Sequence, residues 1–131
     1  MKEKHKKVWV NGTFDVLHLG HIRLLKHAAE LGELYVGIDT DRRVKELKGP
    51  DRPIHNQGER KEMLESFHFV SKVLIFDTSE ELREIVKAVE PDYLVVGAEY
   101  KDRVVGGEHA KEIVYFQRIP NYSTTKILKG K

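Results

Sequence analysis

The sequence of 131 residues contains no cysteine. This absence excludes disulfide scaffolds, cysteine-ligated zinc and thiol nucleophiles, and it fits a reducing compartment. No apolar run approaches the length of about 20 residues that a membrane-spanning helix needs. The basic segment 1–7 has neither the apolar core nor the small-residue cleavage site of a secretory signal. We therefore expect a cytoplasmic protein with no membrane partner.

The sequence also has little net charge. Its 23 lysine and arginine residues nearly offset 21 aspartate and glutamate residues, which leaves a net charge of +2. Short basic runs at 4–7 and 126–131 are compatible with nucleic-acid binding or with ordinary solvated tails. Because no basic stripe is interleaved with aromatic residues, we favour solvated tails and expect no nucleic-acid partner.

Short β-rich runs alternate with helical patterns along the chain. Strands are expected at 7–10, 34–38, 72–76, 93–97 and 113–117. Helices are expected at 20–31, 59–67, about 79–89 and from Ser123, with an irregular polar stretch at 39–56. The strands are nearly continuous apolar runs, which is typical of a parallel sheet covered on both faces. We predict an α/β fold, with one Rossmann-like domain over 1–131 and helices on both faces of a parallel sheet.

The segment after the first expected strand is the first candidate site, since ligands of open α/β sheets bind beyond the carboxyl ends of the strands. Residues 11–21 match neither the glycine fingerprint of dinucleotide-binding folds nor the phosphate loop of P-loop kinases. They contain instead His18, Gly20 and His21 at the start of a predicted helix. Gly20 allows close approach of a ligand to the backbone, and the helix N-terminus favours an anion. Both imidazoles can donate hydrogen bonds to phosphate oxygens and stabilise charge that develops there.

Two other interpretations of this histidine pair stay open. A zinc site needs further ligands, and no third ligand stands at a recognisable spacing, so we expect no metal bound directly by the protein. The other alternative is a pair of ordinary surface histidines, which the remainder of the chain disfavours.

Two motifs lie near opposite ends of the chain. The first reads Gly-Thr-Phe-Asp-x-x-His-x-Gly-His at 12–21, and the second is Ser-Thr-Thr at 123–125 with Arg118 five residues before it. Together they resemble the cytidylyltransferase-type nucleotidyltransferase superfamily. The middle of the chain, notably 41–54 and 91–95, is most similar to heptose-phosphate adenylyltransferases. Glycerol-3-phosphate cytidylyltransferases share both motifs and the short length, and are the alternative within the class.

The resemblance implies roles for particular residues. His18 and His21 would stabilise the transition state at the α-phosphorus, Lys45 would neutralise a phosphate, and Arg118 would hold the departing pyrophosphate. The alternative for Lys45 is a solvated surface lysine. The nucleotide-binding residues that the resemblance implies are Gly12, Thr13, Phe14, Gly20, Gly97, Glu99, Ser123 and Thr124.

Two further residues are candidates for binding the acceptor. Asp15 is one, with a turn-closing carboxylate as its alternative. Arg60 is the other, with a solvated arginine on a helix surface as its alternative. The sequence departs from heptose-phosphate adenylyltransferases at 95–100, where Val-Val-Gly-Ala-Glu-Tyr replaces the usual Val-Lys-Gly-Gly-Asp-Tyr.

The reaction that the resemblance implies is an in-line displacement. A phosphate oxygen of a sugar- or polyol-phosphate attacks the α-phosphorus of ATP or CTP, and pyrophosphate leaves. Mg²⁺ would be held mainly by the triphosphate and water, and a homodimer is implied. Outside this class, the departure at 97–100 leaves open a catalytically inactive nucleotide-binding module, and the basic ends leave open a nucleic-acid adaptor.

Overall fold

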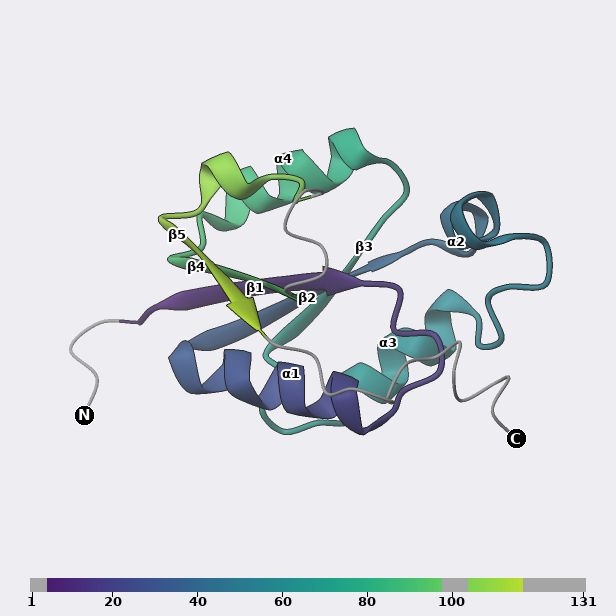
Figure 1. Ribbon diagram of the computed structural model, residues 1–131, viewed down its shortest axis with the longest axis horizontal. Helices are drawn as coiled ribbons and strands as arrows, with labels where there is room; N and C mark the ends of the chain where they lie inside the picture. The colour runs from purple at the N-terminus through teal and green to yellow at the C-terminus, as the bar shows by residue number, and fades with distance from the viewer. Residues whose placement is uncertain (1–4, 98–103, 117–131) are drawn as a thin grey trace.

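The computed structural model describes residues 5–97 and 104–116, and within them one or two helices separate each strand from the next (Figure 1). The strands are β1 (Lys7–Gly12), β2 (Glu33–Asp39), β3 (Lys72–Phe76), β4 (Tyr93–Gly97) and β5 (Glu112–Phe116). The helices are α1 (Leu19–Leu31), α2 (Asp41–Lys48), α3 (Gln57–Glu65), α4 (Ser79–Val89) and the 3₁₀-helix η2 (Gly107–His109). Each predicted strand is present within one or two residues of its expected bounds, and the helix expected from Ser123 lies outside the described residues.

The five strands form one parallel sheet in the order β3-β2-β1-β4-β5. The first three strands run in order from β1 at the centre of the sheet to β3 at one edge. The chain then returns to the other side of β1 to form β4 and β5, so the order of the strands reverses between β1 and β4. Ligands of open α/β sheets bind at such a reversal, at the carboxyl ends of the strands. The predicted Rossmann-like α/β fold is confirmed.

Helices cover both faces of the sheet, with α1 and α3 on one face and α4 on the other (Figure 1). Alternate residues of β1 supply the two cores. Val8 and Val10 pack in the core that contains Leu25 of α1, while Trp9 packs in the core that contains Val86 of α4. Because both faces are buried, the strands need apolar residues at nearly every position, as the sequence pattern indicates.

The prediction of an irregular stretch over 39–56 is wrong for 41–48, which form α2. Thr40 caps the helix by accepting a hydrogen bond from the Arg43 N–H, and Gly49, at φ 108°, ends it with its N–H on the carbonyl of Lys45. Val44 is the only buried residue of this helix. A short helix with one buried position has no apolar periodicity to detect, and its capping residues are what support it.

The described part of the chain has no helix long and apolar enough to cross a membrane.

Candidate active site

A cavity of about 480 Å³ opens at the carboxyl ends of the strands. Each strand contributes to its lining at or near its last residue: Phe76 of β3, Asp39 of β2, Gly12 of β1, Gly97 of β4 and Phe116 of β5. Adjacent strands lie about 4.8 Å apart, so four spacings make this edge about 19 Å wide. The lining residues therefore extend across the whole carboxyl edge of the sheet.

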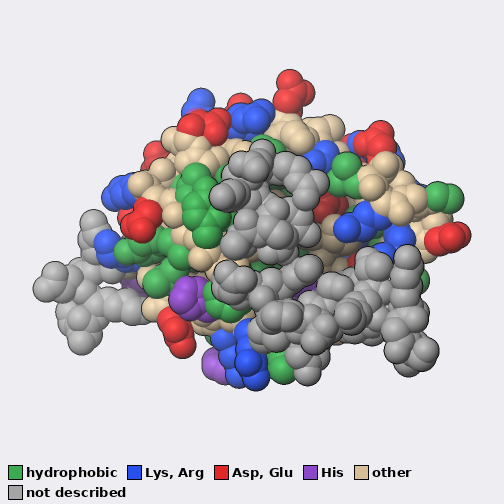
Figure 2. Space-filling view, in the orientation of Figure 1, with side chains coloured by type: hydrophobic (Ala, Val, Ile, Leu, Met, Phe, Trp, Pro, Cys, Tyr) green, Lys and Arg blue, Asp and Glu red, His purple; other side chains and the backbone are tan. Residues whose placement is uncertain are grey.

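The outer surface carries charges of both signs. Basic and acidic side chains are interspersed on the coloured part of the face in Figure 2. In that part of the view no extended basic patch is seen.

The loop between β1 and α1 is shaped by a buried aromatic residue. Phe14 is 4% exposed and adopts a left-handed backbone conformation, with φ 49°, that non-glycine residues rarely occupy. A Cβ atom on Gly12 would lie 3.2 Å from the Phe14 ring, so glycine at this position allows the ring to fold back over the strand end. The ring then meets His21 edge-on at 5.2 Å between centroids. The Gly-Thr-Phe-Asp segment thus packs directly against the histidine pair.

The two histidines stack on each other at the N-terminus of α1, with 3.8 Å between ring centroids, and both line the cavity. His18 is the N-cap residue, and its Nδ1 accepts a hydrogen bond from the Gly20 N–H at 3.0 Å. The Nδ1 of His21 accepts in turn from the His18 N–H at 3.3 Å. Because Nδ1 accepts in both rings, each neutral imidazole carries its proton on Nε2. His18 is only 8% exposed, so it is not an ordinary surface histidine.

Asp15 is a buried carboxylate that holds the loop at 52–55. It is 1% exposed, and it accepts hydrogen bonds from the N–H groups of Ile54 and His55 and from Arg52 Nε at 2.8 Å. Burial alone raises the pKa of this carboxyl. The hydrogen bonds from His55, Ile54 and Arg52, together with the charge of Arg52, outweigh burial and bring the pKa below its usual value. The geometry gives Asp15 the task of placing Arg52 in the cavity wall.

Replacing Asp15 with asparagine is expected to lower the free energy of unfolding at pH 7 by about 1–3 kcal/mol, because buried hydrogen bonds to a charged group are lost. A lowered pKa in the folded state means that Asp15 stabilises the protein above its unfolded pKa and ceases to do so as the pH falls below about 4. As the pH falls from about 5 to about 2, the free energy of unfolding of the variant should therefore decrease less than that of the wild type.

Urea unfolding at several pH values measures this difference. The pKa of Asp92 is also lowered, first by the hydrogen bond from the Lys7 N–H, so part of the acid dependence will remain. Asp51→Asn is the matched control, because Asp51 is an exposed carboxylate close to the same loop. Equal acid dependence in the wild type and in Asp15→Asn would contradict the assignment.

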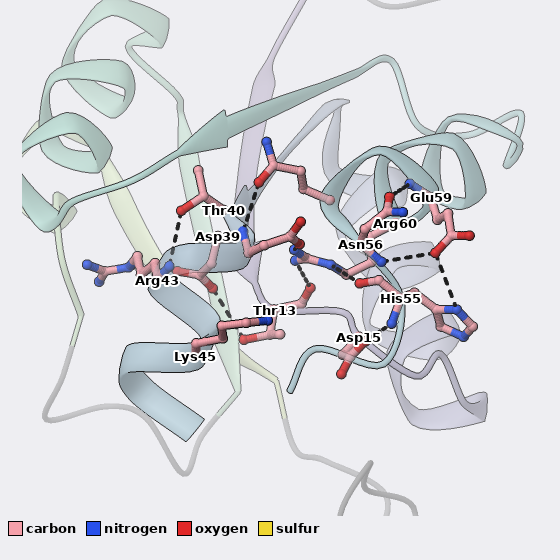
Figure 3. Close-up of polar contacts among 12 residues, drawn as sticks. Thr13, Asp15, Asp39, Thr40, Arg43, Lys45, His55, Asn56, Glu59 and Arg60 are labelled. Carbon is pink, nitrogen blue, oxygen red and sulfur yellow. Dashed lines mark hydrogen bonds and ion pairs between the residues drawn. The ribbon is translucent and has the colours of Figure 1, made fainter. Parts of the chain in front are cut away.

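Arg60, a candidate for binding the acceptor, does not line the cavity. Its side chain is fully buried and joins three segments (Figure 3): Nη1 donates to the carbonyl of Thr13, Nε to the carbonyl of His55, and Nη2 to Asp41. The distances are 2.9–3.0 Å. The structure thus places this guanidinium behind the site, where it braces the Gly-Thr-Phe-Asp loop.

Lys45 is also placed away from the cavity lining. Its Nζ lies 3.4 Å from the carbonyl oxygen of Arg52. Three other cations of the same region, which the sequence interpretation passed over, do line the cavity: Arg43, Lys48 and Arg52. Their place in the sequence could have identified them. They follow β2, and the carboxyl ends of parallel strands share one edge of the sheet, where ligands bind.

The other candidates divide between the cavity and the part of the chain that is not described. Those brought together in the lining are Gly12, Thr13, Phe14, Asp15, His18, Gly20, His21 and Gly97. Glu99, Arg118, Ser123 and Thr124 lie outside the described residues.

The donor set of the cavity bears on metal binding. Among the described residues, no group of three or more histidine, aspartate or glutamate side chains could hold a metal ion. The cavity-lining carboxylates Asp15 and Asp39 each bond an arginine, Arg52 and Arg43 respectively. Each of these two carboxylates is thus already paired with a guanidinium.

Comparison with known proteins decides the family. The family model described as cytidylyltransferase-like matches residues 9–130, nearly the whole chain. The chain belongs to the cytidylyltransferase-like family. Its class of activity is nucleotidyl transfer, and the histidine pair lies at the helix N-terminus where the phosphates of a nucleotide are expected.

Curated relatives cover nearly all of the chain. It is 45% identical over 130 residues to the bifunctional protein HldE of Campylobacter concisus, and 44% identical over 134 residues to that of Nitratiruptor sp.. It is 42% identical over 132 residues to the bifunctional protein HldE of Campylobacter jejuni subsp. doylei. Each match covers 98% of this cytidylyltransferase-like chain but only 27–29% of the relative. The chain thus spans less than a third of the length of these relatives.

Solved structures share the fold. A lipopolysaccharide core biosynthesis protein from Thermoplasma volcanium matches with a TM-score of 0.72 and 24% identity, over 88% of this chain and 99% of its own. A protein of unknown function from Archaeoglobus fulgidus matches with a TM-score of 0.68 and 21% identity, over 92% of this chain and 96% of its own. At these identities the two structures support the architecture of the cytidylyltransferase-like chain, and the substrate must be argued from its own site.

Proposed function

We propose that this chain transfers AMP from ATP to the phosphate group of a heptose 1-phosphate and releases pyrophosphate. The observation that carries the proposal is the stacked pair His18 and His21 at the N-terminus of α1, inside a cavity that spans the carboxyl edge of the sheet. The choice of heptose is supported by the relatives called bifunctional protein HldE and by the similarity of the middle segment to heptose-phosphate adenylyltransferases.

In the proposed reaction a phosphate oxygen of the acceptor attacks the α-phosphorus of ATP. The new P–O bond forms as the bond from the α-phosphorus to the bridging oxygen of pyrophosphate breaks, and pyrophosphate leaves with that electron pair. A phosphate monoester is ionised near neutral pH, so the attacking oxygen needs no general base. The protein's task is positioning and neutralisation of charge.

Each group of the site has a part in this scheme. The Nε2–H groups of His18 and His21 and the N-terminus of α1 would stabilise negative charge on the α-phosphate oxygens. Lys48 and Arg52 line the same cavity and would neutralise charge on the phosphates. A Mg²⁺ ion bound through the triphosphate would neutralise further charge on the departing pyrophosphate.

A pyrophosphate-release assay tests the proposal. The whole chain is mixed with ATP or CTP, each paired with heptose 1-phosphate or glycerol 3-phosphate. We expect release above background only with ATP and heptose 1-phosphate. Release with CTP and glycerol 3-phosphate would replace the proposal with a glycerol-3-phosphate cytidylyltransferase. Nucleotide binding without release from any pair would indicate an inactive nucleotide-binding module.

A further inference from the structure

Arg43 is a cavity-lining arginine that is held by three neighbours. Its Nε donates to Asp39 Oδ1 at 2.7 Å, its Nη2 donates to Ser79 Oγ at 3.1 Å, and its guanidinium carbon lies 5.6 Å from the centre of the Phe76 ring. These partners come from β2, α4 and β3, and the side chain is 16% exposed. A free arginine side chain has about 2 kcal/mol of rotamer entropy, and these contacts remove much of it before any ligand binds. Arg43 is therefore preorganised.

The hydrogen-bonding capacity of this group is only partly used. Among the described residues, none accepts a hydrogen bond from Nη1 of Arg43. Asp39, 6% exposed, neutralises the guanidinium through Oδ1, and its Oδ2 accepts from Thr13 Oγ1 at 3.2 Å (Figure 3). A carboxylate has about four lone-pair sites, so Asp39 can accept further hydrogen bonds. The pair offers a fixed donor beside a fixed acceptor with no net charge, which suits a hydroxyl group better than a second anion.

The order of the strands places Arg43 and Asp39 on one side of the histidine pair, where the proposed function puts the phosphates. β2 and β3 lie on one side of β1, and β4 and β5 lie on the other. The histidine pair follows β1, and thus lies between the half of the cavity at Arg43 and the half at Gly97. β2 and β3 end about 5–10 Å from β1 across the sheet, a separation that the carbon skeleton of a sugar can bridge and a bare phosphate cannot.

We propose that Arg43 determines acceptor specificity by donating a hydrogen bond from Nη1 to a hydroxyl group of the phosphorylated sugar, with Asp39 as the neighbouring acceptor. The inference rests on the proposed function and assigns the half of the cavity at β2 and β3 to the sugar. The nucleotide is left with the half at β4 and β5, where Gly97 lines the cavity.

The test compares Arg43→Met with Arg42→Met in the whole chain, using pyrophosphate release with ATP and heptose 1-phosphate. Arg42 is the matched control, because it precedes Arg43 on α2, is 55% exposed, and bonds Asp77 and Glu46 outside the cavity. We expect Arg43→Met to raise the KM for heptose 1-phosphate by roughly 10- to 100-fold, the loss expected for one hydrogen bond to a charged group. The KM for ATP should change by less than about twofold, and Arg42→Met should change neither KM by more than that.

Monodeoxy analogues of the acceptor give a readout that a purely structural role would not change. In the wild type, the analogue that lacks the contacted hydroxyl should be as poor a substrate as the natural acceptor is for Arg43→Met. The Arg43→Met variant should use that same analogue nearly as well as it uses the natural acceptor, because the contact with this hydroxyl is already absent from the variant. Ser79→Ala, which removes only the partner of Nη2, should raise the acceptor KM by a smaller factor and serves if Arg43→Met folds poorly.

The outcomes separate the two proposals. If the wild type turns over heptose 1-phosphate and Arg43→Met behaves like Arg42→Met, the inference about Arg43 is overturned and the proposed function stands. An equal rise of both KM values in Arg43→Met and Ser79→Ala, with every deoxy analogue affected alike, would likewise reduce Arg43 to a structural residue. If the wild type releases no pyrophosphate with any acceptor, the proposed function fails and the inference fails with it.

Discussion

Replacing His18 with asparagine is expected to lower kcat by about 10²- to 10³-fold, the usual effect of removing one donor from a site that stabilises transition-state charge. The imidazole lines the cavity at the N-terminus of α1, where a nucleotide phosphate would sit. Its proton lies on Nε2, since Nδ1 accepts from Gly20. Nucleotide affinity should fall only modestly, because the contact strengthens as charge develops on the reacting phosphate.

Asparagine is the informative replacement because His18 also caps α1. Asparagine is among the best N-cap residues, so its side-chain oxygen can replace Nδ1 as the acceptor for the first turn. Alanine would remove both the cap and the imidazole, at a cost of about 1 kcal/mol in stability besides the loss of rate. Comparing the two variants separates the two roles of His18.

Steady-state kinetics and thermal unfolding, measured on both variants and on His68→Ala, check this prediction. His68 is exposed and its Ala variant should keep the wild-type rate. A His18→Asn protein with unchanged kcat would contradict the assigned role. A protein that loses rate only in proportion to lost folded fraction would show that His18 acts through the fold alone.

Replacing Arg60 with methionine is expected to lower the free energy of unfolding by about 3 kcal/mol or more, a loss typical of one partner removed from a buried network. The guanidinium is fully buried, and its loss leaves the carbonyls of Thr13 and His55 and the carboxylate of Asp41 without this donor. For a chain of this size a loss of 3 kcal/mol corresponds to a fall in Tm of roughly 10–15 °C.

The same variant decides between two roles for Arg60. Because the side chain does not line the cavity, the KM for the acceptor should change by less than about threefold at a temperature where the variant is folded. Lys61→Met is the matched control, because Lys61 is the next residue of α3, is 42% exposed, and should contribute less than about 0.5 kcal/mol. A stable Arg60→Met protein with a greatly raised acceptor KM would restore the role that the sequence suggests.

Features that depend on local spacing could be predicted from the sequence. The five apolar runs predict the strands because a sheet buried on both faces needs apolar residues at nearly every position. The pair His18 and His21 could be identified because both residues lie at the first turn of the same helix. Their spacing of three residues in the sequence is enough to bring them together there. The helix α2 escaped prediction because Val44 is its only buried residue, so its support comes from capping and from contacts with the rest of the fold.

The residues that line the cavity could not all be predicted from local spacing in the sequence. Arg43, Lys48 and Arg52 resemble other surface cations in the sequence, and the arrangement of β2 beside β1 brings them into the lining of the cavity that the histidines also line. Arg60 shows the reverse case. In the sequence it resembles a solvated arginine on a helix surface, but in the structure its side chain is fully buried.

The sequence by itself determined the five strands, the helices α1, α3 and α4, the family and the histidine motif, because periodicity, capping and motif spacing act over a few residues. Tertiary structure alone decided the strand order, which arginines enter the cavity and which one supports it from behind. Those outcomes depend on contacts between residues far apart in the sequence. Thr13 and Asp39 are 26 positions apart, Thr13 and Arg60 are 47 apart, and Lys7 of β1 bonds Asp92, just before β4, across 85 positions. No local pattern records such contacts, since they form only when the sheet brings the carboxyl ends of its strands together.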